Sequence, residues 1–361
     1  MVILGNVLGL ICGLDFGKLS NKSLSDSREL AAFTPTISLI VPVLNGGENF
    51  RQCLQSVSPI AQKLLEIIVV DDGSTDDSGK LAAEFGAKVI TFPAPGGPAR
   101  ARNKGAEIAR GNILFFIDAD VTLTVETIDR LIAAFSHSPS LDALIGSYDD
   151  SPGSPNFLSQ YKNLFHHYTH QTSSEEASTF WGACGAVRRD AFWAVGGFDE
   201  CYRYPSVEDI ELGYRLKREG YQIKLDKTIQ VKHLKHWRVG SLLRADIFYR
   251  AIPWTELLWR DRQFSNDLNL KNSSRLSLIL TYLLVICLIG GWWWSILWLF
   301  ALGISFALLL LNFSVYRFFL QKRGILFTFG VIPWHWLYFF YGGLAFVIGT
   351  IRYRLYHKLK I

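Results

Sequence analysis

Acidic residues follow three short apolar runs in this sequence of 361 residues. They are Glu48, Asp71-Asp72 and Asp118-Ala119-Asp120. If the apolar runs are parallel strands of one sheet, these carboxylates gather at one edge of it. Clustered like charges need a cation or a donor-rich ligand, so this edge is a candidate binding site. The nearby Ser74 and Asp76 are expected only to cap the next helix.

Asp118 and Asp120 form the carboxylate pair best suited to metal binding. They are one residue apart and directly follow Ile113–Ile117, a run of five apolar residues. Alternate carboxylates on a segment that leaves a strand can approach one divalent cation together, and such cations prefer hard oxygen ligands. An Asp-x-Asp pair is common by chance. It is the position of this pair directly after a predicted buried strand that favours a metal site.

The elements that must position these residues alternate along the chain. Apolar, β-branched runs predict strands over 37–41, 67–70, 87–91, 113–117 and 228–231. Helices are predicted between them, over 50–57, 81–85 and 99–109. Alternation of this kind predicts an α/β fold with a mostly parallel sheet and helices on both faces. Ligands of such sheets bind at the carboxyl ends of the strands.

Composition shows that the chain is not purely soluble. Only 19% of its residues are charged, against about 25% in soluble proteins. The deficit is local, because 276–311 has no charged residue or histidine and 324–351 has one histidine, His335. The five cysteines are scattered, which excludes zinc fingers and a disulfide framework. We therefore expect a reducing, cytoplasm-facing globular part attached to a membrane.

The first uncharged stretch predicts a membrane hairpin. Its 36 residues exceed the roughly 20 that one span needs. Gly290-Gly291, followed by three tryptophans, predicts a turn at the far interface, where tryptophan is enriched. The second stretch, 325–351, is either one span or a segment broken at Pro333 that returns to the cytoplasm, and the sequence leaves both open.

Basic residues flank these stretches. Between Lys235 and Arg275 there are eight lysines and arginines against four acidic residues, and 352–361 adds four more with no acid. Positive charge beside apolar spans marks the cytoplasmic side of a membrane. No soluble segment interleaves basic and stacking aromatic residues, so nucleic-acid binding is not expected. The apolar start, 1–14, is too short to span and is expected to be an extension rather than a signal peptide.

Seven segments together resemble family 2 glycosyltransferases of the GT-A fold. They are ISLIVPVLN, EIIVVDDGSTD, GGPARARNKG, ILFFIDADV, FWGACGAVRR, GGFDE and VEDIELGYRLKREGY. Each segment is unspecific, but the ordered set covers about 37–235 with the spacing of that family. The resemblance implies a nucleotide-diphospho-sugar transferase fold, a nucleoside-diphosphate sugar donor, and Mg²⁺ or Mn²⁺. A glycine cluster at 96–97 that is not GxGxxG argues against a dehydrogenase.

The resemblance also assigns roles to individual residues. It implies that Pro42 and Leu44 line the nucleotide base and that Asp72 hydrogen-bonds it. Arg102, with Asn103, would either lie near the nucleotide or help to shape its pocket. Asp118, Ala119 and Asp120 would contact the donor, with Asp118 reaching ribose and metal-bound water and Asp120 ligating the metal. In some relatives a histidine near the last strand joins the metal, which makes His233 a third candidate ligand; the alternative is a structural histidine.

Asp209, in the pair Glu208-Asp209, is implied to be the general base. An acceptor hydroxyl is a poor nucleophile, so a positioned carboxylate must take its proton as it attacks the anomeric carbon. Attack opposite the leaving diphosphate inverts that carbon. The alternative is that Glu208 and Asp209 only favour a helix N-terminus electrostatically.

Two differences between this sequence and the patterns of related families indicate which class of acceptor to expect. The Gln-x-x-Arg-Trp segment of processive polymer synthases is absent at 231–238, which favours transfer of one sugar. Polyprenyl-phosphate glycosyltransferases are similar, but their acceptor is already an anion and needs no base, and Thr122 stands where they commonly have glutamine. We therefore expect a hydroxyl acceptor on a lipid or lipid-linked glycan of the cell envelope. The alternatives are a polyprenyl-phosphate acceptor and a non-catalytic protein that binds nucleotide sugars.

The expected organisation has four parts. An N-terminal extension (1–36) precedes a catalytic domain (37–235), a membrane-interface region (236–275) and a transmembrane region (276–361). Within the third part, 242–259 resembles an interfacial amphipathic helix interrupted by Pro253, which either guides a lipid acceptor or holds the domain on the membrane. The expected location is the cytoplasmic (inner) membrane, multi-pass, with the catalytic domain facing the cytoplasm.

Overall fold

The structure is a computed structural model that describes residues 34–261 and 272–359. Most of the expected N-terminal extension, 1–33, therefore lies outside the described residues, as does 262–271 at the end of the expected interface region. The described residues belong to one compact unit.

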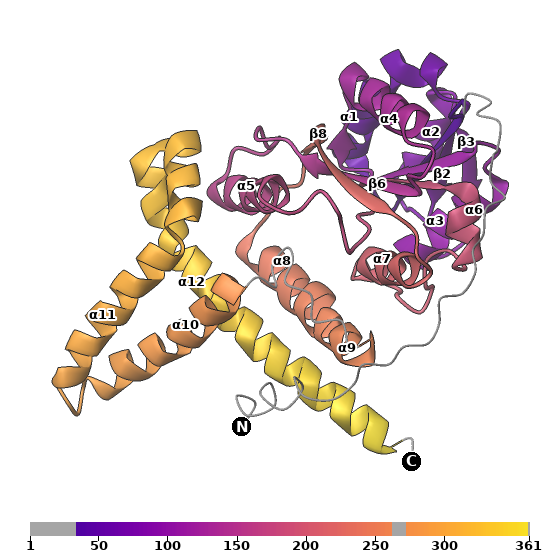
Figure 1. Ribbon diagram of the computed structural model, residues 1–361. Coiled ribbons are helices and arrows are strands. Elements are labelled where there is room, and N and C mark those ends of the chain that lie inside the picture. The colour runs from indigo at the N-terminus through magenta and orange to yellow at the C-terminus, as the bar shows by residue number, and fades with distance from the viewer. Residues whose placement is uncertain (1–33, 262–271, 360–361) are drawn as a thin grey trace. The chain divides into compact units, whose positions relative to one another are not determined.

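A sheet of eight strands forms the centre of the described residues before α8 (Val239–Arg244) (Figure 1). Its spatial order is β3-β2-β1-β4-β7-β6-β8-β5. The strands are β1 (Ile37–Val43), β2 (Glu66–Asp71), β3 (Lys88–Thr91), β4 (Ile113–Ile117), β5 (Val121–Thr122), β6 (Ala143–Tyr148), β7 (Cys184–Arg188) and β8 (Ile223–His233). Neighbours from β3 to β4 are parallel, as are β6 and β8. β7 is antiparallel to β4 and β6, and β5 is antiparallel to β8, so the sheet is mixed.

Helices cover both faces of the sheet, as the alternating pattern predicts. α3 (Pro98–Ile108), α6 (Arg189–Ala194) and α7 (Glu208–Arg218) share one apolar core with Ile40, Val70 and Phe116 of the central strands. α1 (Gly47–Val57), α2 (Ser78–Glu84) and α4 (Val125–His137) lie over the other face (Figure 1). The 3₁₀ helix η1 (Ser58–Lys63) follows α1. The strand residues alternate between these two cores because successive side chains of a strand point to opposite faces.

Aromatic residues join the sheet to the C-terminal helices. α5 (Phe157–Gln171) carries Tyr161, which packs with Phe319 and Val331 in one buried cluster. α8 (Val239–Arg244), the π-helix η2 (Ala245–Ala251) and α9 (Ile252–Asp261) follow β8. Pro253 does not interrupt this segment; it lies in the first turn of α9, where a missing N–H is tolerated.

Within the part of the chain that the structure describes, two C-terminal helices are long and apolar enough to cross a membrane, by length and composition. They are α10 (Asn272–Gly290) and α12 (Phe313–Leu359); α11 (Ile296–Leu311) between them is shorter. The chain turns between α10 and α11 within the Gly-Gly-Trp-Trp-Trp segment.

The bend in α12 is at Gly324 and not at Pro333. Gly324 has φ 78° and ψ 178°, values outside the helical region, and the helix then runs through Pro333 to its end. A positive φ is accessible to glycine because it has no Cβ, so the helix can bend at Gly324 without steric strain. The break at Pro333 that the sequence left open is absent from α12.

Candidate functional site

Asp72 orders the loop before α3. Its two carboxylate oxygens accept hydrogen bonds from Gly96 N (2.9 Å) and Gly97 N (2.8 Å), and the side chain is buried. Gly97 has φ +100°, and a Cβ there would lie 2.5 Å from the carbonyl oxygen of Arg203. The carboxylate therefore fixes a tight glycine turn that sets the start of α3; a contact between Asp72 and a base stays a prediction.

Arg102 of α3 bridges two carboxylates from separate parts of the chain. Its Nη2 donates to Asp118 Oδ1 at 2.7 Å, and its Nη1 donates to Glu208 Oε1 at 2.9 Å. The Arg102 and Glu208 side chains are each 5% exposed, whereas Asp118 is 36% exposed. The guanidinium thus joins the end of β4 to the start of α7 through a buried ion pair.

Asp209 lies beside this bridge at the start of α7. Its Oδ2 accepts from Gly182 N at 3.0 Å and its Oδ1 accepts from Ile210 N at 2.8 Å. Burial, together with the neighbouring Glu208 carboxylate, raises the pKa of Asp209 to about 6. A half-buried carboxylate with a raised pKa is a stronger base than an ordinary aspartate, which is the property a general base requires.

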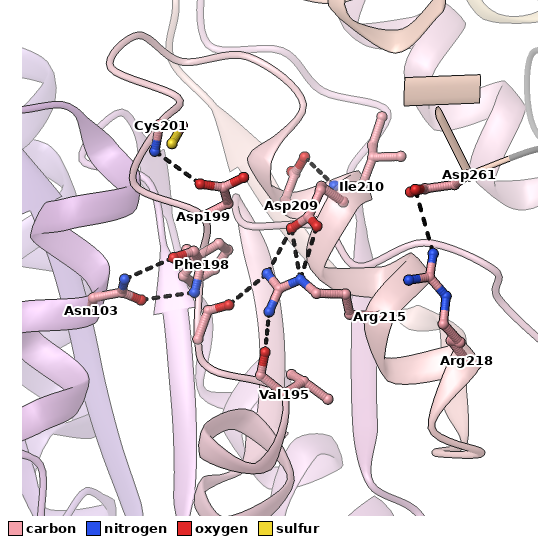
Figure 2. A network of polar contacts seen from close by, with 12 residues as sticks. Asn103, Val195, Phe198, Asp199, Cys201, Asp209, Ile210, Arg215, Arg218 and Asp261 are labelled. Carbon is pink, nitrogen blue, oxygen red and sulfur yellow. Dashed lines mark hydrogen bonds and ion pairs between the residues drawn. The ribbon is translucent and has the colours of Figure 1, made fainter. Parts of the chain in front are cut away.

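Asn103 and Arg215 hold the segment of the chain that precedes α7 (Figure 2). Asn103 Nδ2 donates to the Phe198 carbonyl at 2.9 Å, and Phe198 N donates to Asn103 Oδ1 at 2.8 Å. Arg215 donates to Glu211 and to the carbonyls of Val195 and Gly197. Asn103 therefore fixes the loop at Phe198, and its role at the nucleotide pocket stays a prediction.

Asp120 faces His233. The Asp120 Oδ2 to His233 Nε2 distance is 3.5 Å, and His233 Nδ1 is 2.7 Å from Asn163 Oδ1. The His233 ring stacks on Tyr148 with centroids 4.5 Å apart. Burial raises the pKa of Asp120, but the interaction with His233 outweighs it and brings the pKa to about 2. Asp120 is therefore an ionised carboxylate beside a fixed imidazole nitrogen.

The donor set fits a divalent cation that is shared with a ligand. Within the described residues, no three side chains of His, Cys, Asp or Glu surround one point. Asp120 and His233 supply two neighbouring donors, while an oxygen of Asp118 is already bound by Arg102. Mg²⁺ is commonly held by one or two carboxylates plus substrate phosphates and water, and this set agrees with that pattern.

The remaining predicted residues lie at the same edge of the sheet. Pro42 is near the end of β1, paired with Val70 of β2, and the Leu44 side chain is 46% exposed just beyond it. Ala119 lies between Asp118 and Asp120 and is partly exposed. Ser74 and Asp76 accept from Asn45 N and Gly47 N, so they hold the loop before α1 and do not only cap the next helix, which is the role that the sequence predicted. Asp76 also accepts from Ser78 N at the start of α2.

A cavity of about 200 Å³ opens beside Asp209. Its walls come from the catalytic part, α5, η2, α9 and α12, and include Lys162, His166, His170, Trp181, Asp209, Asp246, Arg250, Trp254, Tyr338 and Tyr341. The sequence predicted a role for Asp209 and, within the stretch 242–259, for the segment that contains Asp246, Arg250 and Trp254. Of the others, only Trp181 gave a signal, by its position within FWGACGAVRR, because the remaining residues are scattered along the chain.

Residues 38–196 match the family described as Glycosyl transferase family 2. The chain carries a family 2 glycosyltransferase domain. Among curated proteins, glycosyltransferase GlyG of Streptococcus pneumoniae is 32% identical over 125 residues, which is 32% of this chain and 41% of that protein. The uncharacterized glycosyltransferase YibD of Escherichia coli is 37% identical over 91 residues, 24% of this chain and 26% of that protein. The matches thus span less than half of these relatives.

The glycosyltransferase domain has the GT-A fold. A mannosyltransferase from Pyrobaculum calidifontis, solved with GDP-Man and Mn²⁺, superposes with a TM-score of 0.53 over 87% of this chain and 88% of that one, at 17% identity. The mostly parallel, mixed sheet agrees with the predicted fold class.

Proposed function

We propose that this protein transfers one sugar from a nucleoside-diphosphate sugar to a hydroxyl of a lipid or lipid-linked glycan, with inversion. The observation that carries the proposal is Asp209, a carboxylate with a pKa near 6 that lines a cavity beside the Arg102 bridge. A raised pKa strengthens a base that must accept a proton from a hydroxyl. A carboxylate that only stabilises a helix N-terminus does not require a raised pKa.

Each residue of the site has a separate role in the proposed reaction. The acceptor oxygen forms a bond to the anomeric carbon while the bond from that carbon to the diphosphate breaks. Asp209 takes the hydroxyl proton, and the leaving diphosphate keeps the electron pair. Bound Mg²⁺ or Mn²⁺ would neutralise the diphosphate charge. Asp120 and His233 would hold the ion, and the mannosyltransferase that shares the fold was solved with Mn²⁺.

Two sets of contacts support a membrane-attached protein whose glycosyltransferase domain lies on one side of the membrane. Beyond the α10–α11 hairpin, Lys322 pairs with Asp150 at 2.6 Å and Arg323 donates to Gln160 Oε1 at 2.8 Å. The return end of the hairpin therefore meets the glycosyltransferase domain. Since positive charge marks the cytoplasmic side, we place the domain at the cytoplasmic face of the inner membrane.

The second half of α12 follows α9 along its length. Tyr341 donates to Asp246 at 2.7 Å, Trp259 donates to Thr350 at 3.0 Å, and Arg352 pairs with Glu256 at 3.0 Å. Because α9 also contacts α7 through Trp254 and Tyr214, this half of α12 stays beside the domain. We propose that it lies at the membrane interface, which also leaves the basic tail in the cytoplasm.

Nucleotide release from a panel of donor sugars tests the function. The full chain in detergent is assayed with and without Mn²⁺ and lipid extract. Turnover that requires an acceptor and is lost in Asp209→Asn supports the proposal. Turnover with polyprenyl phosphate that survives this change would identify the alternative acceptor class. Donor binding without turnover would identify a non-catalytic binding protein.

The activity should rise with pH through about 6. Asp209 is a base only when unprotonated, so kcat/KM should fall about tenfold per unit below its pKa and level off above it. Removing the adjacent carboxylate by Glu208→Gln lowers the Asp209 pKa, and the acid limb should move to lower pH. A pH profile of both proteins measures this. An acid limb that stays in place in Glu208→Gln would contradict the assignment.

Asp120→Asn should weaken the response to metal. The change removes the ionised oxygen donor beside His233 but keeps the side-chain size, so the Mn²⁺ concentration for half-maximal activity should rise tenfold or more. Asn163→Ala, which frees the other imidazole nitrogen, should raise it less. Asp77→Asn, at an exposed aspartate, is the control. Equal Mn²⁺ titrations in Asp120→Asn and Asp77→Asn would refute the metal site.

A further inference from the structure

The cavity beside Asp209 is built from two kinds of surface. Trp181 and Asp209 belong to the glycosyltransferase domain, whereas Tyr338 and Tyr341 belong to a helix that is apolar enough to cross a membrane. A molecule bound here touches the candidate base at one end and an apolar helix at the other. An acceptor that fits both walls is amphipathic.

One cation of the cavity, Arg250, makes no side-chain hydrogen bond within the described residues. Asp246 is buried, and its two oxygens are taken by Lys162 Nζ at 2.6 Å and by the Tyr341 hydroxyl at 2.7 Å. Arg250 Nη1 is 3.8 Å from Asp246 Oδ1, beyond hydrogen-bond distance, and its side chain is 44% exposed. Lys162 therefore neutralises Asp246, while Arg250 still presents its donors.

The other titratable groups of the cavity include two histidines, which are neutral, and Asp209, which is negatively charged at pH 7 because its pKa is about 6. Burial lowers the pKa of His170 to about 4 and places that of His166 well below its ordinary value, so both rings are neutral at pH 7. Asp209 points its oxygens at two backbone N–H groups. Arg250, with its donors not hydrogen-bonded to any described residue, lies in a partly enclosed, aromatic-lined cavity and is suited to a phosphate, which it can bind with two parallel hydrogen bonds.

We propose that this cavity binds the phosphate-bearing head of a lipid acceptor, with the phosphate on Arg250 and the acceptor hydroxyl at Asp209. The proposal rests on the proposed function and deepens it by naming the acceptor class. Trp181 and Trp254 then enclose the head group, and the lipid chain leaves along Tyr338 and α12.

Lipid binding without donor tests the proposal separately from turnover. The full chain in detergent is titrated calorimetrically with two short-chain probes, dihexanoyl phosphatidic acid and dihexanoylglycerol, which differ only in the phosphate. We expect the phosphate-bearing lipid to bind about tenfold more tightly, because a charge-assisted hydrogen bond is worth that much. Arg250→Gln should abolish the preference. Arg244→Gln, at an exposed arginine outside the cavity, should keep it.

Two further arms identify the source of the phosphate. Inorganic phosphate and a nucleoside diphosphate are added as competitors at the concentration of the lipid. We expect neither to displace it, because neither has an apolar part to contact α12. Equal affinity for the two lipids, a preference that survives Arg250→Gln, or displacement by inorganic phosphate would overturn the proposal. Since no donor is present, these outcomes do not depend on whether the protein transfers sugar.

Discussion

Asp209→Asn should reduce kcat by a factor of about 10² to 10⁴, the range that a general base contributes. The amide cannot take the proton of the attacking hydroxyl. The substitution is nearly isosteric, and the side chain still accepts from one of its two backbone donors, Gly182 N or Ile210 N. Donor affinity and the melting temperature should therefore change little. Acceptor-dependent nucleotide release and donor binding, measured on the same preparation, separate these effects.

Asp190→Asn is the matched control for this prediction. Asp190 also lies in the first turn of a helix, and its Oδ1 accepts from the following residue, Ala191 N, at 2.9 Å, as Asp209 does with Ile210 N. It is exposed and lies outside the cavity. If helix capping were the role of Asp209, the two substitutions would have similar small effects on stability and none on kcat. That result would refute the base assignment.

Arg102→Met should destabilise the domain by about 3–5 kcal/mol and abolish turnover. The change leaves Glu208 buried without its counter-ion, and breaking a buried pair costs about this much. It also removes the guanidinium that links Asp118 to Glu208 and so joins β4 to α7, and the donor and acceptor sides of the site are no longer fixed together. Thermal unfolding of the detergent-solubilised chain, followed by near-UV circular dichroism, measures the loss.

Lys104→Met is the control on the same helix. Lys104 pairs with Glu107 on the surface, with side chains 38% and 61% exposed, and such pairs contribute at most about 1 kcal/mol. A second test adds Glu208→Gln to Arg102→Met, which removes the stranded charge and should recover part of the lost stability. Equal melting temperatures for Arg102→Met and Lys104→Met would show that the bridge is not a buried ion pair in solution.

Local patterns predicted the elements around the site. The run ILFFI predicted a strand over 113–117, and β4 is Ile113–Ile117. Helical spacing of Phe50, Cys53, Leu54 and Val57 predicted the buried face of α1. These predictions succeed because the period of apolar residues records which face of an element is buried, whatever it packs against.

The antiparallel strand β7 was not predicted. It inserts between β4 and β6, and its sequence, CGAVR, has too few β-branched residues to stand out. Its position depends on hydrogen bonds to strands that are about 70 and 40 residues away in the chain. No local pattern carries that information.

The sequence by itself determined the chemistry at the strand ends: acidic residues after buried strands, a glutamate-aspartate pair on a helix, and apolar stretches with basic flanks. Only the tertiary structure decided that Arg102 joins Asp118 to Glu208, that His233 faces Asp120, and that Asp246 is neutralised by Lys162 and Tyr341. The reason is physical. The pKa of a carboxylate and the partner of a cation depend on distance and burial in three dimensions, and each of these contacts joins residues that are far apart in the chain.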